Sequence, residues 1–141
     1  MDKNQDLLKR REEAKVGGGQ ARIDKQHQGG KLTARERVTV LLDEGSFNEI
    51  GQFVEHRATS FGLDKTKFPG DGVITGFGTV HGRLVYIFSQ DFTVLGGSLS
   101  ETYGKRLYCR KNQPRSAYLR RPRFRFENPE ENKRYFYQLD G

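Results

Sequence analysis

The stretch that decides the fold is residues 69–101, which read PGDGVITGFGTVHGRLVYIFSQDFTVLGGSLSE. Two parts of it, residues 75–80 and 83–89, are rich in the β-branched and aromatic side chains that favour strands. The His81-Gly82 pair between them suits a tight turn that requires positive φ. We therefore expect a β-hairpin, and the rest of the chain is interpreted relative to it.

Beyond the hairpin, the chain changes character at Gly96-Gly97 and then resembles the start of a helix. Ser98 suits the N-cap position, and Glu101 suits the third position of a capping box. A strand that runs through a glycine corner into a helix N-terminus can offer N–H groups to an anion. The alternative is that the turn simply requires small residues, and the residues favour neither interpretation. Asp91 is predicted to be a turn or cap residue rather than a catalytic one.

Three helices are expected before the hairpin. The first covers residues 6–15 and ends at a run of three glycines. The second covers residues 20–28, and its charged side chains are interpreted as a solvated face. The third begins at a capping box formed by Thr33 and Glu36. It carries apolar residues at the spacing of a buried stripe and then a terminating glycine: Val38, Leu41, Leu42 and Gly45.

The segments between the third helix and the hairpin give weaker signals. Residues 46–56 are expected to form a pair of short strands, residues 57–67 a polar loop, and residues 68–72 a turn cluster. Gly76 and Gly78 lie inside the first hairpin strand. Because a strand rather than a helix follows them and the third glycine is misplaced, they do not form a dinucleotide-binding fingerprint, and we interpret them as flat, closely packed strand positions.

The net charge of +7 belongs to the C-terminal part of the chain. Of the 25 basic and 18 acidic residues, residues 106–126 hold eight bases and no acid. Pro114 and Pro122 interrupt any helix in this segment. Its arginines alternate with aromatic side chains, a mixture that can contact phosphates and stack on the bases of a nucleic acid. A solvated, disordered or artefactual tail is the alternative.

Several other classes of function find no support in the sequence. His27, His56 and His81 are far apart and lack a second ligand at metal spacing, so we expect surface histidines and no metal site. Cys109 is the single cysteine, which excludes an internal disulfide. The longest apolar run, residues 84–88, is far shorter than the roughly 20 residues of a membrane helix. No secretory or transit peptide is evident, so a cytoplasmic location is expected.

Four stretches carry a family resemblance: KLTARER at 31–37, LLDEGSF at 41–47, FPGDGV at 68–73 and SQDFTVLGGS at 89–98. Over about residues 7–104 the chain resembles the carboxyltransferase (β) subunits of biotin-dependent acyl-CoA carboxylases. The resemblance implies an α+β, crotonase-like fold of the ClpP/crotonase superfold, built from repeated β-β-α units. In this chain, N-terminal helices, a β-hairpin, a strand-to-helix corner and an irregular basic tail would make up an incomplete domain of that kind.

The resemblance also implies a reaction. A carboxyl group moves from carboxybiotin, held on a partner carrier protein, to the α-carbon of an acyl-CoA, with propionyl-CoA the favoured substrate. The implied ligands are acyl-CoA and biotin without a metal, and the implied partners are a biotin carboxylase/biotin carrier subunit and further copies of the chain in a hexamer. Catalysis in the family uses backbone N–H groups, the first set in a D-S-G-G-A-R stretch expected after Gly104. Because this sequence does not contain that stretch, no catalytic residue is assigned and the chain alone is expected to be inactive.

The site residues follow from the same resemblance, which places the adenine and phosphate path of CoA at the glycine corner. The corner residues expected to line it are Phe92, Thr93, Val94, Gly96, Gly97 and Ser98. Lys105 is expected to contact a phosphate.

Residues 1–105 are therefore predicted to be the N-terminal part of a carboxyltransferase domain, with a helical arm over 5–45, a β-rich part over 46–97 and a helix start over 98–105. Residues 106–141 depart from the family pattern as a divergent basic tail, through truncation, a frame shift or a fusion. Two other hypotheses remain open: a basic interaction or nucleic-acid-binding module, and a non-functional gene product.

Overall fold

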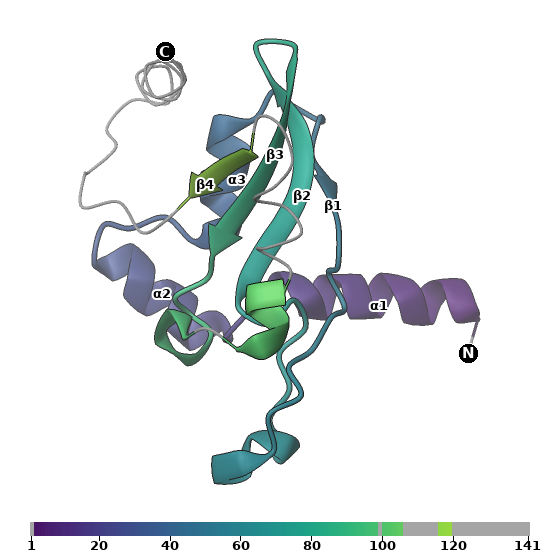
Figure 1. Cartoon of the computed structure of the whole chain (residues 1–141), viewed down its shortest axis with the longest axis vertical. Helices are drawn as coiled ribbons and strands as arrows, with labels where there is room; N and C mark the ends of the chain where they lie inside the picture. Colours follow the sequence, from purple (N-terminus) through teal and green to yellow (C-terminus); the bar gives the residue numbers. More distant parts are fainter. Residues whose placement is uncertain (1, 99, 106–115, 120–141) are drawn as a thin grey trace.

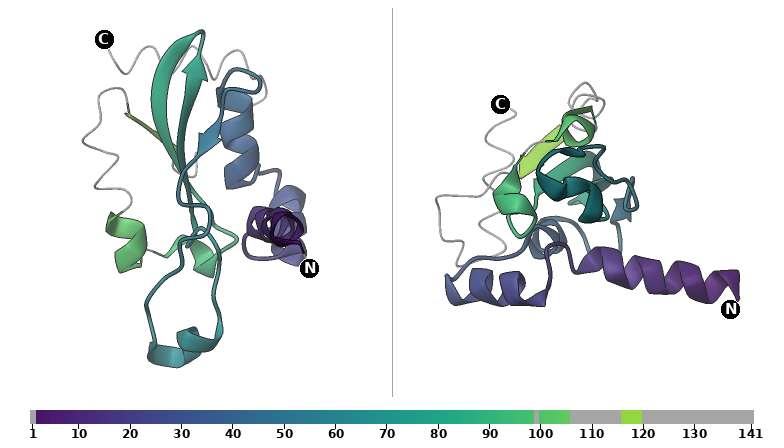
Figure 2. Two further views of the ribbon diagram at one scale, coloured as in Figure 1. Left: turned by 90° about the vertical axis from the view of Figure 1, so that its right-hand side faces the viewer. Right: turned by 90° about the horizontal axis from the view of Figure 1, so that it is seen from below.

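The computed structural model describes residues 2–98, 100–105 and 116–119, in which three helices precede a twisted sheet (Figure 1). The described strands form one sheet in the order β1-β2-β3-β4. One helix lies along a face of this sheet, and the other two lie near the end of the hairpin opposite its turn (Figure 2). The elements in chain order are α1 (Lys3–Lys15), α2 (Gln20–Gln28), α3 (Ala34–Leu41), β1 (Asn48–Glu49), η1 (Ser60–Lys65), β2 (Val73–Val80), β3 (Arg83–Gln90), η2 (Leu95–Gly97) and β4 (Ser116–Leu119).

The predicted hairpin is present as β2 and β3. The two strands are antiparallel, and their register runs from Val73 opposite Gln90 to Val80 opposite Arg83. At the turn, His81 has a φ of 49° and Gly82 a φ of 74°. Two positive φ values in a two-residue turn match the twist of the flanking strands. The predicted hairpin and the position of its turn are therefore confirmed.

Asp43 holds this turn from outside the hairpin. Its carboxylate accepts hydrogen bonds from the Thr79 hydroxyl at 2.7 Å, from His81 N–H at 3.0 Å and from Gly82 N–H at 2.8 Å. A non-glycine residue with positive φ is strained, and these bonds offset that strain at His81. They also tie the chain that follows α3 to the far end of the hairpin.

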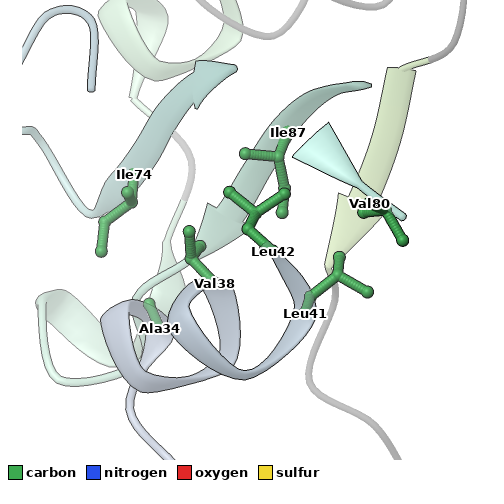
Figure 3. Close-up of a cluster of buried hydrophobic side chains, with 7 residues drawn as sticks. All are labelled: Ala34, Val38, Leu41, Leu42, Ile74, Val80 and Ile87. Carbon is green, nitrogen blue, oxygen red and sulfur yellow. The ribbon is translucent and has the colours of Figure 1, made fainter. Parts of the chain in front are cut away.

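The main hydrophobic core lies between α3 and one face of the hairpin, as Figure 3 shows. The predicted capping box is present: Glu36 N–H donates to the Thr33 hydroxyl at 3.2 Å, and Thr33 N–H donates to the Glu36 carboxylate at 2.7 Å. The buried side chains of the cluster come from the helix, the residue after it and both strands: Ala34, Val38, Leu41, Leu42, Ile74, Val80 and Ile87.

The expected helix stop at Gly45 is wrong, because α3 ends at Leu41 and Leu42 is already extended with a ψ of 155°. The early end has a packing reason. A Cβ built on Gly78 would lie 2.7 Å from Leu42 Cδ1, so the Leu42 side chain fills the space above that glycine. The extended backbone at Leu42 also brings the next residue, Asp43, to the hairpin turn.

Only one short strand forms where a pair was expected over residues 46–56. β1 pairs with β2, with Asn48 opposite Phe77 and Glu49 opposite Gly76. A Cβ on Gly76 would overlap the carbonyl oxygen of Asn48, so this strand position is closely packed, as predicted. Beyond β1, the same edge of the sheet bonds to a loop, because Ile50 N–H donates to the Thr75 carbonyl at 2.8 Å.

The helix after the glycine corner begins later than predicted, at residues 101–105, and Ser98 is not its N-cap. The Ser100 hydroxyl accepts from Tyr103 N–H at 2.9 Å and donates to the Asp71 carboxylate. The expected capping box with Glu101 at its third position is therefore wrong. Tyr103 explains the shift, since it is fully buried against Val73 and Phe88. A start at Ser100 directs that ring into the sheet.

Within residues 106–141 the structure describes only β4, which pairs in parallel with β3, with Ser116 opposite Tyr86. This strand was not predicted. The basic and aromatic residues proposed to contact nucleic acid lie outside the described residues, apart from Tyr118 within β4. In the described part of the chain, no helix is both long and apolar enough to cross a membrane.

Candidate functional site

An open cleft of about 650 Å³ separates α2 from the chain that follows β3. In Figure 1, α2 lies beside the green turn at the end of that chain. We call this space the α2 cleft. Its lining residues are Arg22, Lys25, Gln26, Gly29, Lys31, Phe92, Thr93, Leu95 and Gly96. One side is helical and basic, and the other is a loop with an aromatic ring and a glycine.

Thr93 fixes the distance between the two sides. Gly18, in the linker before α2, donates its N–H to the Thr93 hydroxyl at 3.0 Å. A Cβ on Gly18 would overlap the carbonyl oxygen of Thr93, so only glycine permits this approach. The Arg22 guanidinium donates to that carbonyl oxygen at 3.0 Å. The linker and the first turn of α2 are therefore bound to the backbone of the loop.

The loop itself is a turn stabilised by Asp91, as the sequence predicted. One carboxylate oxygen of Asp91 accepts from Thr93 N–H at 2.9 Å and from the Thr93 hydroxyl at 2.6 Å. Gly96 has a φ of 64° and Gly97 a φ of 81°, so the glycine corner uses conformations that glycine adopts without strain. A Cβ on Gly97 would lie 2.8 Å from the Phe92 ring, which shows how closely the ring packs on that backbone.

The α2 cleft is lined by cations without a carboxylate. Arg22 is engaged with Thr93, as described above. The ammonium groups of Lys25 and Lys31 have no hydrogen bond or ion pair within the described part of the chain. Such a surface favours an anion, and the adjacent Phe92 ring favours a ligand that also has a planar or apolar group.

The structure brings some of the predicted site residues together. Phe92, Thr93 and Gly96 line the α2 cleft. Val94 and Gly97 are buried behind it, with Val94 only 3% exposed. These two residues support the loop rather than face the cleft. Thr93 is as buried as Val94, at 3% exposed, so Phe92 and Gly96 are the predicted residues that are both at least partly exposed and on the cleft. The prediction that this corner binds CoA remains a prediction.

Ser98 and Lys105 lie away from the α2 cleft. The Ser98 hydroxyl donates to the Leu95 carbonyl at 2.7 Å, which closes the η2 turn. Lys105 forms an exposed ion pair with Glu101 at 2.5 Å, one helical turn earlier. Neither residue lines the cleft.

Sequence reasoning missed the basic side of the cleft. Arg22 and Lys25 belong to the helix at residues 20–28, whose charged side chains were interpreted as a solvated face, and Lys31 follows its C-terminal turn. One signal was available: Arg22 and Lys25 are three positions apart and therefore share a helical face. The partner of that face, the Thr93 loop, is 71 positions from Arg22 and was not predictable from local pattern.

The three histidines occupy different environments. His81 is exposed in the hairpin turn, and His27 is partly exposed, as expected. His56 contradicts the prediction, because it is only 3% exposed and its Nε2 lies 2.8 Å from the Thr66 carbonyl oxygen. The folded 57–67 segment supplies that acceptor. Among the described residues, no three His, Cys, Asp or Glu side chains come together to hold a metal ion.

His27 also acts on Glu36, the third residue of the α3 capping box. The His27 Nε2 atom lies 2.9 Å from the Glu36 carboxylate. Partial burial tends to raise the pKa of Glu36, but the hydrogen bonds from His27 and from Thr33 outweigh burial and lower this pKa below its ordinary value. The pair links α2 to α3.

Comparison with known proteins gives concordant results. The sequence profile of the family described as carboxyl transferase domain matches residues 25–128. The propionyl-CoA carboxylase beta chain of Roseobacter denitrificans is 63% identical over 101 residues, which cover 72% of this chain and 20% of that protein. The methylmalonyl-CoA decarboxylase subunit alpha of Propionigenium modestum is 55% identical over 105 residues, 74% of this chain and 20% of that protein. The chain thus spans about a fifth of the length of these curated relatives.

A solved structure agrees in fold. The transcarboxylase 12S structure, a hexamer with methylmalonyl-coenzyme A and methylmalonic acid bound, superposes with a TM-score of 0.75 at 44% identity. The superposition covers 82% of this chain and 25% of the transcarboxylase chain. The family match extends to residue 128, beyond the point near residue 104 where the resemblance was expected to end. The described residues are thus part of a crotonase-like α+β domain, and the chain belongs to the carboxyl transferase domain family.

Proposed function

We propose that the protein acts in biotin-dependent carboxyl transfer to an acyl-CoA, and that this chain contributes one side of the acyl-CoA site. The observation that carries the proposal is the α2 cleft, where three cations and the Phe92 ring face the same space within a carboxyl transferase fold. CoA combines phosphates with an adenine ring, so its nucleotide part complements such a surface. The binding of methylmalonyl-coenzyme A by the solved transcarboxylase supports a ligand of this class.

In the proposed reaction, the bond between the carboxyl carbon and N1 of biotin breaks and a bond from that carbon to the α-carbon of the acyl-CoA forms. The α-proton replaces the carboxyl group on the biotin nitrogen. Negative charge develops on the thioester oxygen, and backbone N–H groups stabilise such charge. This chain has no assigned group for that step. Its proposed role is to bind and orient the substrate, which lowers the entropic cost of the transfer.

The substrate and partners are part of the same proposal. Propionyl-CoA is the first acyl-CoA to test, because the Roseobacter relative is a propionyl-CoA carboxylase beta chain. Biotin would be supplied by a carboxylase/carrier partner. Further copies of the chain would complete an oligomer, since the solved transcarboxylase is a hexamer. A cytoplasmic location is likewise proposed.

Thermal unfolding of the 141-residue chain with and without propionyl-CoA tests the proposal. A ligand that binds only the folded state at about 100 times its dissociation constant stabilises that state by about 2.7 kcal/mol. We expect an increase in Tm with propionyl-CoA that Phe92→Ala abolishes. Gly104→Ala is the matched control, because that position is outside the cleft and a Cβ there meets nothing within 4 Å.

A transfer assay with carboxybiotin separates binding from catalysis. We expect the chain alone to bind propionyl-CoA without carboxylating it. Two results contradict the proposal: no thermal stabilisation at millimolar propionyl-CoA, or equal stabilisation of the Phe92→Ala variant.

A further inference from the structure

We propose that Arg37 and Gln90 are positioning residues, which fix the orientation of the Phe92 ring from behind the site. Both side chains are buried, at 8% exposed, and neither lines the α2 cleft. Their hydrogen bonds lead from α3 through the last residue of β3 to the glycine corner. The inference rests on the proposed function for its ligand. It goes further in assigning the order of the ring to two residues that do not touch that ligand.

Arg37 connects α3 to the end of β3. Its Nη2 group donates to the Gln90 carbonyl at 2.5 Å, and its Nε group donates to the Thr33 carbonyl at 3.3 Å. Burial of a guanidinium group removes its hydration, which only well-placed hydrogen bonds offset. Asp91 N–H donates to the Gly72 carbonyl at 2.8 Å. The peptide group between Gln90 and Asp91 is therefore held at both of its polar atoms, at the point where the strand becomes the loop.

The Gln90 side chain extends these contacts to the glycine corner. Its amide group donates to the carbonyl oxygen of Gly97, seven positions later in the chain. Gly97 N–H donates to the Val94 carbonyl at 2.8 Å. The buried backbone of Gly97 is thus bound on one side to the strand end and on the other to the loop. Without the Gln90 amide, a buried carbonyl group would lose this donor, and the corner would separate from the strand.

The Phe92 ring rests on the same glycine. A Cβ built on Gly97 would lie 2.8 Å from Cδ1 of the ring, 2.9 Å from Cε1 and 3.2 Å from the Gln90 amide nitrogen. The ring and the amide therefore approach Gly97 from the side on which a side chain would project. The amide fixes the glycine, and the glycine supports the ring. Displacement of Gly97 would remove this support.

A ring that is already fixed binds a planar group at a smaller entropic cost than a mobile ring. Ordering one side chain during binding weakens affinity by about threefold to tenfold. If Arg37 and Gln90 order the Phe92 ring when the chain folds, their loss should have an effect of this size. A role in stability alone would lower Tm and leave the affinity of the folded chain unchanged.

Proton NMR of the 141-residue chain without ligand tests the position of the ring. The ring current of Phe92 shifts the Hα signals of Gly97, and Phe92→Leu should remove this shift. We expect Gln90→Met, which deletes the amide at similar volume, to reduce the shift clearly. Arg37→Met should reduce it as well, whereas Arg37→Lys, which keeps a donor, should retain it.

Two exposed positions supply matched controls. Gln20→Met and Arg10→Met make the same chemical changes on α2 and α1, and both should leave the Gly97 signals unchanged. Circular dichroism identifies any variant that has unfolded. If Arg37→Met does not fold, the Gln90→Met variant still tests the proposal.

Titration with propionyl-CoA gives the second readout. We expect about threefold to tenfold weaker binding by Gln90→Met. In a double-mutant cycle, Gln90→Met should weaken binding no further once Phe92→Leu is present, because the amide acts through the ring. Phe92→Leu is used here because leucine keeps an apolar contact.

The two readouts separate the two proposals. An unchanged Gly97 shift in Gln90→Met, unchanged affinity, or additive effects in the cycle would each overturn the positioning role and leave the proposed function standing. A reduced shift in a chain that does not bind propionyl-CoA at all would support the positioning of the ring and overturn the proposed function.

Discussion

Gly18→Ala is the substitution that tests most directly how the α2 cleft is assembled. A Cβ at this position would overlap the carbonyl oxygen and carbonyl carbon of Thr93, which are backbone atoms and cannot rotate away. The linker before α2 would have to move off the loop. Two hydrogen bonds to Thr93 would then be lost, one from Gly18 N–H and one from Arg22.

The cost follows from these contacts. Overpacking of a tight site costs about 1 to 3 kcal/mol, and each lost hydrogen bond costs about 1 kcal/mol. Because the movement that relieves the overlap also breaks the bonds, we expect a total of about 2 to 4 kcal/mol. For a domain of about 100 residues this lowers Tm by roughly 10 °C or more.

Gly104→Ala supplies the comparison in the same assay, differential scanning calorimetry. Gly104 lies in the helix at residues 101–105, and a Cβ there meets nothing within 4 Å. Alanine in a helix is favoured over glycine by about 0.5 to 1 kcal/mol, so this variant should be slightly more stable than the unchanged chain. If Gly18→Ala unfolded at the same temperature as Gly104→Ala, the contact between the linker and Thr93 would not be the constraint that we infer.

Three further predictions concern the scaffold. Asp43→Ala removes the acceptor of three hydrogen bonds at the hairpin turn and should cost about 2 to 3 kcal/mol in urea unfolding, whereas an unchanged midpoint would show that the turn is self-sufficient. Ser100→Ala should lower the free energy of unfolding by about 1 kcal/mol, because an N-cap is lost, and Ser98→Ala should lower it clearly less. A larger effect of Ser98→Ala would instead indicate that Ser98 is the N-cap. Glu36 has a folded pKa below its unfolded value, so its contribution to stability is present above the unfolded pKa and lost as pH falls through the folded pKa. Glu36→Gln should reduce the acid dependence of Tm below about pH 5, and an identical pH profile would contradict this.

The parts of the fold that were predicted are those encoded by neighbouring residues. The hairpin depends on a two-residue turn, and α2 is bounded by glycines at both ends, so its limits, residues 20–28, agree with the prediction. The Thr33 capping box is equally local. Each of these signals is complete within a few positions of the chain. Tertiary contacts had only to preserve what the local sequence already favoured.

The predictions that were wrong depend on contacts between residues that are far apart in the chain. Both Ser98 and Ser100 satisfy the sequence rule for an N-cap, and the choice is made by Tyr103, which has to reach the sheet, and by Asp71, which accepts from Ser100. His56 is buried, and its ring contacts a carbonyl group ten positions later in the chain. Neither the spacing of apolar residues nor the secondary-structure propensities of the sequence predict these long-range contacts.

The candidate site shows the same division. Family motifs pointed to the glycine corner, which does form the loop side of the α2 cleft. The helical side was missed because a charged helix face looks the same in sequence whether solvent or a ligand covers it. Only the bonds from Gly18 and Arg22 to Thr93 show which face of α2 is turned toward the loop.

Those bonds also bear on the order in which the chain folds. The hairpin closes over two residues and can form within microseconds, whereas Gly18 and Thr93 are 75 positions apart in the chain. Bringing such distant segments together costs chain entropy that is repaid only when both sides are already structured. The α2 cleft should therefore assemble late, after the strands are paired. In a refolding experiment, the capacity to bind nucleotide would then appear in the slowest kinetic phase, behind the recovery of β structure.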